Sequence, residues 1–439
     1  MLETIRNAWK IRELRQRLLF VAFILLVFRL GNAIPVPFIN TTALQSYFDA
    51  ASSNILGLMN VMSGGAFGQG TVFALSIQPY INASIIIQLL TVAIPALERL
   101  AKDGGEDGKR KIEKITRYST LAIGLLQGSG YYALLRSNGL LATTSIWAAI
   151  VIVITFTAGS VFVMWLGEQI TEFGIGNGIS VLLFGGIVSR APNAAYYMYV
   201  AVRNYLAGNT DGSISLAPWF IPLILLASLL LVVFVVFING AERRIPVQYA
   251  KRVVGRKQYG GQASKIPMKV NMSGVLPIIF AQTIATIPAT IAAFFRQPAE
   301  GSFGAGLLNF LDTDGVPYMI FYFLLIIAFG YFYATIQFNP VEVANNLKKN
   351  GGFIPGYRPG KPTSEFIQKV LNKVTLFGAI YLGVIACVPI IISACSKAAA
   401  NTGISLGGTS IIIVVGVAIE TVQALENQML MRHYKGFLE

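Results

Sequence analysis

TVFALSIQPYINASIIIQLLTVAIPAL, residues 71–97, is a run of 27 residues without a charged side chain. A helix of about 20 predominantly apolar residues crosses the hydrocarbon core of a bilayer, so this run is long enough to span a membrane. The segment that follows it, residues 98–117, holds seven Lys and Arg. A long apolar run that ends in a basic segment is typical of a transmembrane helix ending at the cytoplasmic face.

Nine further apolar runs resemble this one, and they explain the composition of the 439-residue chain. Hydrophobic residues make up 54% and charged residues 12%, with a mean hydropathy of +0.63. A soluble domain carries roughly 25% charged residues, so a soluble fold is disfavoured. Strands of a membrane barrel alternate in polarity over about ten residues, whereas these runs are longer and apolar throughout. The ten predicted spans are residues 18–34, 71–97, 117–135, 146–166, 179–199, 216–238, 271–295, 317–338, 374–394 and 408–430.

Positive charge is concentrated on one side of this alternating pattern. Of the 34 Lys and Arg, 28 lie in residues 1–17, 98–117, 239–270, 339–373 and 431–439. Lys and Arg are enriched in the cytoplasmic loops of membrane proteins, so both termini are expected in the cytoplasm. The six exceptions are Arg29, Arg136, Arg190, Arg203, Arg296 and Lys397. Orientation and anionic lipid headgroups explain most of the net charge of +14.

Ten spans divide into five and five, and this division predicts the symmetry of the fold. Because five is odd, the second half starts from the opposite side of the membrane, as an inverted repeat requires. We therefore expect an all-α polytopic membrane protein with ten transmembrane helices in two inverted halves, residues 1–200 and 201–439. The second and seventh spans also echo each other weakly, since both mix an internal proline with small polar residues and isoleucine.

The segment NILGLMNVMSGGAFGQG, residues 54–70, interrupts the regular pattern. Residues 55–62 suit a helix that is too short to cross the membrane, and Gly64, Gly65, Gly68 and Gly70 follow as a hinge. We expect a full helix to begin at about Thr71. Non-helical backbone at membrane depth is tolerated where it lines a cavity, so a re-entrant half-helix predicts an interior cavity. An external amphipathic loop is the alternative, and these residues alone favour neither.

Two cytoplasmic segments are longer and more basic than orientation requires. Residues 239–270 alternate apolar and basic side chains and carry a Gly-Gly pair, which predicts a hairpin. Residues 339–373 predict a short helix that stops at Gly351–Gly352, followed by a Pro/Gly-rich turn around Arg358. This excess charge favours a partner on the cytoplasmic face.

Motifs for enzymatic chemistry are nearly absent from the sequence. The GK pairs at 108–109 and 360–361 lack the upstream glycine and the Ser or Thr of a phosphate-binding loop. The lone histidine, His433, has no metal-ligand companions, and acidic residues do not cluster at the midplane of any span. We therefore expect no catalysis, cofactor or metal. The spans contain isoleucines at helical spacing instead. By itself, this pattern is typical of side chains that pack in a core or face lipid.

Six strings resemble the SecY family, the pore subunit of the bacterial protein translocase, in order and over essentially the whole chain. They are SIQPYINASIIIQLL (76–90), FGIGNGIS (173–180), ERRIPVQYAKR (242–252), NMSGVLPIIFA (271–281), FNPVEVANNLKKNGGFIPGYRPG (338–360) and GGTSIIIVV (407–415). The resemblance implies a channel that moves unfolded secretory polypeptides across the cytoplasmic membrane and releases hydrophobic segments sideways into lipid. A secondary transporter of small solutes is the alternative, but it needs a midplane binding site.

The resemblance also assigns roles to residues. The implied pore ring is Ile81, Ile85, Ile179, Leu183, Ile279 and Ile413. The plug is the half-helix at 55–66, with Ile55, Leu56, Leu58, Met59, Val61 and Met62. Gln88 and Gln282 are candidate polar contacts of the lateral gate. The partner-docking residues are Arg243, Arg244, Lys251, Arg252, Arg256 and Arg358. The implied partners are the small membrane subunits SecE and SecG, the SecA motor ATPase, the ribosome, the translocating polypeptide and anionic lipids.

Overall fold

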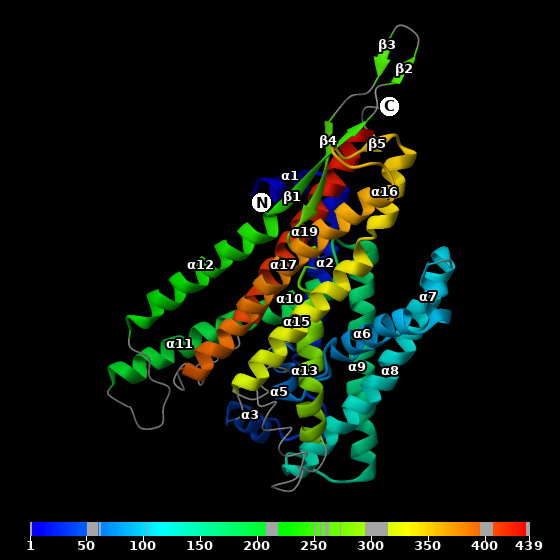
Figure 1. Ribbon diagram of the computed structural model, residues 1–439. Coiled ribbons are helices and arrows are strands. Elements are labelled where there is room, and N and C mark those ends of the chain that lie inside the picture. Colours follow the sequence, from blue (N-terminus) through cyan, green and yellow to red (C-terminus); the bar gives the residue numbers. More distant parts are fainter. Residues whose placement is uncertain are drawn as a thin grey trace.

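The computed structural model describes residues 2–50, 60, 63–102, 104–207, 218–249, 252–254, 257–259, 263–272, 274–294, 315–395 and 407–435. These residues form a helical bundle with a small set of strands at one end (Figure 1). The helices up to residue 206 are α1 (Leu2–Lys10), α2 (Arg12–Gly31), α3 (Thr41–Ala50), α5 (Ala66–Gln69), α6 (Gln78–Ala93), α7 (Pro95–Lys102), α8 (Gly105–Ser137), α9 (Ile146–Phe173), α10 (Gly178–Val188) and α11 (Ala191–Leu206). Those that follow are α12 (Phe220–Gly240), α13 (Leu276–Phe294), α15 (Val316–Gln337), α16 (Pro340–Lys349), α17 (Lys361–Cys395) and α19 (Gly407–Lys435).

Every predicted span contains helix among its described residues, as expected of a polytopic α-helical membrane protein. Among the described residues, four helical stretches are individually long and apolar enough to cross a membrane, and α6 with α7 would make a fifth. The four are Ile146–Phe173, Val316–Lys349, Lys361–Val388 and Ser410–Leu430. Shorter apolar stretches lie in α12 and α13, at Leu226–Gly240 and Leu276–Ala285. The division into inverted halves stays a prediction.

The second predicted span differs from the expected single helix. Residues 72–77 form turns, and the helix begins at Gln78 rather than at about Thr71, which forms an isolated bridge with Pro35. The chain bends by 105° between α6 and α7, at the residue before Pro95. A residue that precedes proline is pushed out of the helical region, and Ile94 accordingly has φ −106° and ψ 113°. This proline is visible in the sequence and explains the break.

The fifth predicted span is also interrupted. Helix α10 ends at Val188, and α11 begins at Ala191 with Pro192 in its first turn. Proline is well tolerated in the first turn of a helix but lacks the N–H that would continue a preceding one. The interruption leaves α10 as a short helix of 11 residues that is buried at Val181, Leu182 and Leu183.

The largest hydrophobic core gathers side chains from α2, α6, α9, α10, α12, α13, α15, α17 and α19. A second cluster lies around α3, α5, α8 and α9, where Phe67 stacks on Tyr131 with ring centroids 4.3 Å apart. Helices α3 and α5 lie toward the end of the bundle opposite the strands (Figure 1). At the strand end, α1 packs against the last part of α19 through Ala8 and Leu425. The two ends of the described chain therefore lie on one side of the bundle.

The predicted hairpin is confirmed. Strand β1 (Glu242–Tyr249) pairs antiparallel with β4 (Ala263–Lys269), and β2 (Arg252–Val254) pairs with β3 (Lys257–Tyr259) beyond them. The two-residue strand β5 (Gly352–Phe353) completes a sheet in the order β4-β1-β5. Helix α16 ends at Lys349, immediately before the predicted stop. Strand β5 therefore joins the two long basic segments into one surface at the strand end of the bundle (Figure 1).

Candidate functional site

All six residues of the predicted pore ring belong to the largest hydrophobic core of the described residues, together with many other side chains. They come from four helices that are distant in sequence, and all but Ile179 are buried. The six are Ile81 and Ile85 on α6, Ile179 and Leu183 on α10, Ile279 on α13, and Ile413 on α19. Residues four apart share one face of a helix, so each of α6 and α10 presents a pair of side chains to the cluster. The largest core therefore contains every side chain of the predicted ring.

The start of α10 fixes the position of its two ring residues. Asn177 Oδ1 accepts hydrogen bonds from the backbone N–H groups of Ile179 and Ser180, at 3.1 and 3.4 Å, so Asn177 caps the helix. The Gly178 N–H donates to Thr171 Oγ1 at 3.0 Å. A Cβ atom at Gly178 would overlap the carbonyl oxygen of Gly167, so only glycine permits α9 and α10 to approach this closely. These contacts tie the first turn of α10 to the end of α9.

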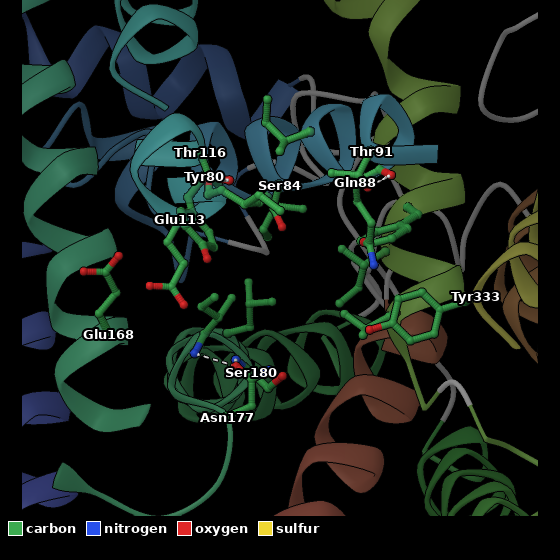
Figure 2. A pocket seen from close by; sticks show the side chains of 18 of the residues that line it. Tyr80, Ser84, Gln88, Thr91, Glu113, Thr116, Glu168, Asn177, Ser180 and Tyr333 are labelled. Atoms are coloured by element: carbon green, nitrogen blue, oxygen red, sulfur yellow. Dashed lines mark hydrogen bonds between the residues drawn. The ribbon is translucent and has the colours of Figure 1, made fainter. Parts of the chain in front are cut away.

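A cavity of about 420 Å³ lies beside the ring, with four of the ring residues in its wall. Figure 2 shows its polar lining, which comes from α6, α8, α9, the start of α10, and α15. The ring residues in the wall are Ile81, Ile179, Leu183 and Ile279. The polar ones are Tyr80, Ser84, Gln88, Thr91, Glu113, Thr116, Glu168, Asn177, Ser180 and Tyr333. The cavity therefore combines apolar and polar walls, and no described residue of the 54–70 segment is among its lining residues, so the cavity predicted from that segment stays a prediction.

The two predicted gate glutamines occupy different environments. Gln88 lines the cavity, and its side chain lies near that of Tyr333 of α15. The two side chains point toward one another across the cavity (Figure 2). Gln282, on α13, is 5% exposed and lies outside the cavity lining. Tyr333 was not a sequence candidate, because a tyrosine within an apolar span carries no signal of the partner that it will meet.

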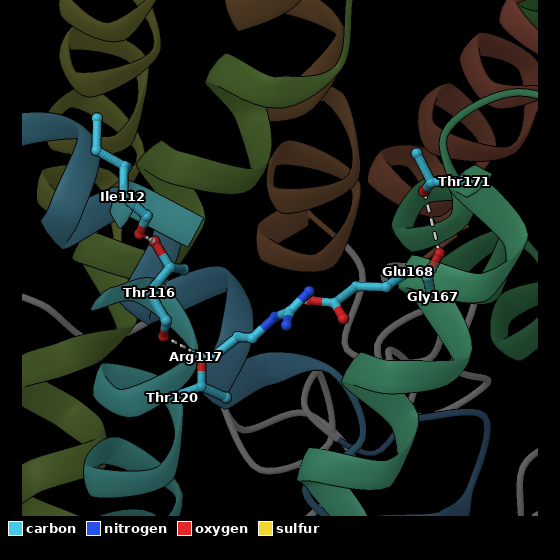
Figure 3. Close-up of polar contacts among 7 residues, drawn as sticks. All are labelled: Ile112, Thr116, Arg117, Thr120, Gly167, Glu168 and Thr171. Carbon is cyan, nitrogen blue, oxygen red and sulfur yellow. Dashed lines mark hydrogen bonds and ion pairs between the residues drawn. The ribbon is translucent and has the colours of Figure 1, made fainter. Parts of the chain in front are cut away.

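An ion pair holds α8 and α9 together next to the cavity. Arg117 Nε lies 2.8 Å from Glu168 Oε1 (Figure 3). Three threonine hydroxyls nearby donate to backbone carbonyls of their own helices, at 2.8 to 3.0 Å. Both charged side chains are partly exposed, at 49% and 27%, so the pair is expected to stabilise the fold only modestly. The spacing of residues along the sequence does not identify this pair, because the two side chains lie on different helices.

The described part of the glycine hinge has the backbone that the sequence pattern predicts. Gly64, Gly65 and Gly70 have φ values of 69°, 93° and 60°, a region that glycine adopts readily. Gly68 differs from the prediction because it lies inside the short helix α5 and not at a bend. Asn60 Oδ1 accepts a hydrogen bond from the Gly68 N–H at 2.8 Å. The six predicted plug residues Ile55, Leu56, Leu58, Met59, Val61 and Met62 lie outside the described residues.

The basic surface is built on the three-stranded sheet and the turn that follows it. Arg243 and Arg244 lie exposed on β1, and Arg244 pairs with Glu242. Arg252 lies in β2, whereas Lys251 and Arg256 fall outside the described residues. A cluster of Ile245, Val247, Met268, Leu347, Ile354, Ile367 and Leu371 packs beneath the sheet. The surface is therefore a packed platform with its own small core.

Arg358 projects from a constrained turn on this platform. Gly356 and Gly360 flank it with φ values of 86° and 107°, and its carbonyl oxygen accepts a hydrogen bond from Thr363 Oγ1 at 2.7 Å. The neighbouring Tyr357 ring stacks on Phe366 with centroids 4.2 Å apart. These contacts fix the backbone on both sides of Arg358, while its side chain stays exposed.

Comparison with known proteins supports one family over the whole chain. The family model described as SecY matches residues 71–422. The protein translocase subunit SecY of Streptomyces coelicolor is 46% identical, and the match covers 100% of both chains. Among solved structures, the fold resembles a SecY protein whose plug domain is described as stabilising the closed state of the translocation channel, with a TM-score of 0.65 at 18% identity over 94% of this chain and 92% of that one. It also resembles Sec61 in the canine ribosome–channel complex, with a TM-score of 0.65 at 16% identity over 95% and 93% of the two chains.

These matches agree with the six strings that the sequence shares with the family. The structural neighbours, at 16% and 18% identity, establish the fold alone. The relative from Streptomyces covers the chain from end to end, and the family model spans the described ring, the cavity and the basic platform. On both grounds, the chain is a member of the SecY family.

Proposed function

We propose that the chain forms a protein-conducting channel, which moves unfolded polypeptides across the bacterial cytoplasmic membrane and has both termini in the cytoplasm. The observation that carries this proposal is a cavity with four apolar side chains of the predicted ring in its wall, contributed by three helices that are distant in the sequence. A channel for unfolded chains must pass every kind of side chain, so it cannot rely on a chemically selective filter. An apolar constriction can gate by dewetting and can close around a polypeptide without binding it.

The glycine hinge and the seam between α6 and α13 suggest how such a channel closes and opens. Residues 55–66 act as a plug that blocks the resting pore. Helices α6 and α13 form a lateral gate through which hydrophobic segments leave for the lipid, and Gln88 and Gln282 lie along it. The relative whose plug domain maintains a membrane seal supports the first of these roles.

The basic platform docks the partner that supplies energy. Arg243, Arg244, Lys251, Arg252, Arg256 and Arg358 contact the SecA motor or the ribosome, whose acidic side chains or phosphates they complement. The fold shared with Sec61 in a ribosome–channel complex supports a ribosome on this face. SecE and SecG accompany the chain in the membrane, and anionic lipids contact its basic loops. Because the sequence has no nucleotide-binding motif, the channel takes its energy from these partners.

A secondary transporter of small solutes remains the second candidate. The cavity beside the ring has polar walls, as a solute site requires, and it contains Glu113 and Glu168. However, Glu168 is paired with Arg117, and four apolar ring residues line the same cavity. The family to which the chain belongs further favours the channel.

Reconstitution tests the proposal directly. The chain is placed in vesicles together with SecE and SecG, and a secretory precursor, SecA and ATP are added outside. We expect ATP-dependent protection of the precursor from protease. Vesicles that contain the partner subunits without the chain are the control. Equal protection in the two preparations would contradict the proposal.

A further inference from the structure

Arg29 is a charge that the orientation of the chain does not explain. It is one of the six Lys and Arg outside the basic segments, and it lies in the last turn of α2. A long cationic side chain at a helix end often extends toward the membrane surface, which would give Arg29 no specific partner. In the structure, Arg29 Nη1 instead lies 3.3 Å from the carbonyl oxygen of Gly64 and 3.3 Å from Ser189 Oγ. Its contacts therefore join α2 to the glycine hinge and to the end of α10.

Neighbouring contacts converge on the same point of the hinge. Asn32 Nδ2, one turn after Arg29, donates to the carbonyl oxygen of Ser63 at 3.5 Å. A Cβ atom at Gly64 would lie 3.0 Å from the carbonyl oxygen of Gly186, so the hinge also packs closely on α10. Ser189 Oγ, which accepts from Arg29, donates to Gly186 O at 2.7 Å. The consecutive carbonyls of Ser63 and Gly64 thus accept hydrogen bonds from side chains at the C-terminal end of α2, and Gly64 packs against the backbone of α10.

The chemistry of arginine suits this position. Gly64 has a φ value of 69° and lies outside a helix, so its carbonyl oxygen takes no part in a helical ladder. A guanidinium can donate to two acceptors at once, and charge-assisted hydrogen bonds are roughly twice as strong as neutral ones. Without the contact, glycine at this position can adopt several other backbone conformations. Arg29 therefore stabilises one backbone conformation of Gly64, a residue whose backbone could otherwise adopt several.

Helix α10 connects this contact to the ring. It carries Ile179 and Leu183 of the ring, and Ser189 is the residue that ends it. A displacement of α10 by a polypeptide in the pore would carry Ser189 and Gly186 with it. Such a movement would separate Ser189 from Arg29 and remove the surface on which Gly64 packs.

We propose that Arg29 holds the glycine hinge of the plug against α10 in the resting channel through its hydrogen bonds to Gly64 and Ser189, and that these bonds break when α10 moves. We call this set of contacts the latch. The proposal rests on the proposed channel function and on the plug role of residues 55–66. It assigns Arg29 and Ser189 a part in keeping the resting pore closed. It also explains why an arginine lies at the outer end of the first span, away from the basic face.

The test measures the resting ion conductance of the complete reconstituted complex in planar bilayers. Arg29→Gln is expected to raise the open probability of the resting channel by roughly tenfold, as the loss of a charged hydrogen-bond donor predicts. Arg29→Lys keeps the positive charge but loses the planar guanidinium group with its several donors. Its resting open probability should therefore lie between those of wild type and Arg29→Gln. Ser189→Ala removes one of the two acceptors and should produce a smaller increase. Arg203→Gln is the matched control, because Arg203 also lies in the last turn of a helix on the predicted outer side.

A deletion of residues 57–65 distinguishes a failure of the latch proposal from a failure of the plug proposal. If the deletion raises the resting conductance while Arg29→Gln and Ser189→Ala match wild type, the latch is wrong and the plug stands. If the deletion has no effect, the plug role and the latch both fail. Arg29→Gln within the deletion should add nothing, and an added increase would contradict the proposal. An increase in Arg203→Gln equal to that in Arg29→Gln would show a general charge effect and would also overturn it.

Discussion

Tyr249 and Gly352 are antiparallel partners, and this pairing joins two basic segments that are far apart in the sequence. A Cβ atom at Gly352 would lie 2.9 Å from the Tyr249 ring, so the close pairing depends on glycine. The sheet of β1, β4 and β5 therefore forms one platform, and the hairpin and the turn that carries Arg358 are held relative to each other. A partner that docks there meets a defined arrangement of charges.

Gly352→Val should loosen this platform. The added side chain would collide with the Tyr249 ring and cost about 1–3 kcal/mol, as overpacking typically does. We expect faster proteolysis within residues 239–270 and reduced uptake of a precursor, at normal membrane levels. Gly240→Ala is the control, because a Cβ atom there meets no described atom within 4 Å. Proteolysis at the wild-type rate would show that β5 does not hold the hairpin.

Arg358→Glu should abolish most partner-dependent transport without disturbing membrane insertion. The remaining basic segments still fix the orientation of the chain. Loss of a charge-assisted contact is worth about 1.5–3 kcal/mol, or about tenfold or more in affinity, and the reversed charge adds repulsion. Arg358→Lys should be intermediate, because lysine does not reproduce the planar donor pair of arginine. Binding of the partner to reconstituted vesicles measures both, and near-normal transport by Arg358→Glu would rule out the docking role.

Gly178→Ala should displace α10 from α9. The new Cβ would overlap the Gly167 carbonyl oxygen, a backbone atom that cannot rotate away, so we expect a loss of about 1–3 kcal/mol in stability. Gly167→Ala is the matched control, because a Cβ there would meet its neighbours at an ordinary 3.4 to 3.5 Å. Thermal unfolding in detergent compares the two variants. Equal midpoints would contradict the close approach of α9 and α10 that positions Ile179.

Tyr333→Phe should make lateral exit easier. The hydroxyl faces Gln88 across the cavity beside the proposed gate, and a neutral hydrogen bond between the two side chains would contribute about 0.5–1.5 kcal/mol. We expect cross-links from an apolar substrate segment to lipid to form up to roughly tenfold faster. Tyr331→Phe is the control, because its hydroxyl bonds Asn372 O at 3.2 Å, away from Gln88. Identical rates in the two variants would remove Tyr333 from the gate.

Hydropathy and charge predicted the membrane architecture because each span is a local property of about 20 residues. The hairpin at 239–270 was also predictable, since alternating side chains around a Gly-Gly pair are a local signal. The interruptions at Pro95 and Pro192 differ from the predicted spans, although both prolines are visible, because hydropathy averages over them. Local patterns thus explain most of the membrane helices and the hairpin, whereas several helix ends differ from the predicted bounds.

Contacts between distant elements could not be predicted from local patterns. A two-residue strand such as β5 has no periodicity, so its pairing with β1 is decided by tertiary structure. The partners of Tyr333 and Arg117 lie on other helices, and nothing in the spacing of residues identifies them. The ring residues were assigned from the family resemblance, because isoleucine pairs at helical spacing are equally typical of packing. Their gathering in one cluster is a property of the folded chain.

Cross-linking to a stalled polypeptide tests the central claim most directly. A photoreactive residue is placed in turn at each ring position, and a secretory chain is arrested partway across reconstituted vesicles. The positions are Ile81, Ile85, Ile179, Leu183, Ile279 and Ile413. A seventh probe at Phe237, whose side chain is 72% exposed on α12, serves as the lipid-facing control. The channel account predicts cross-links from all six ring positions to the arrested chain and from Phe237 to lipid, whereas cross-links from the ring to lipid alone would contradict it.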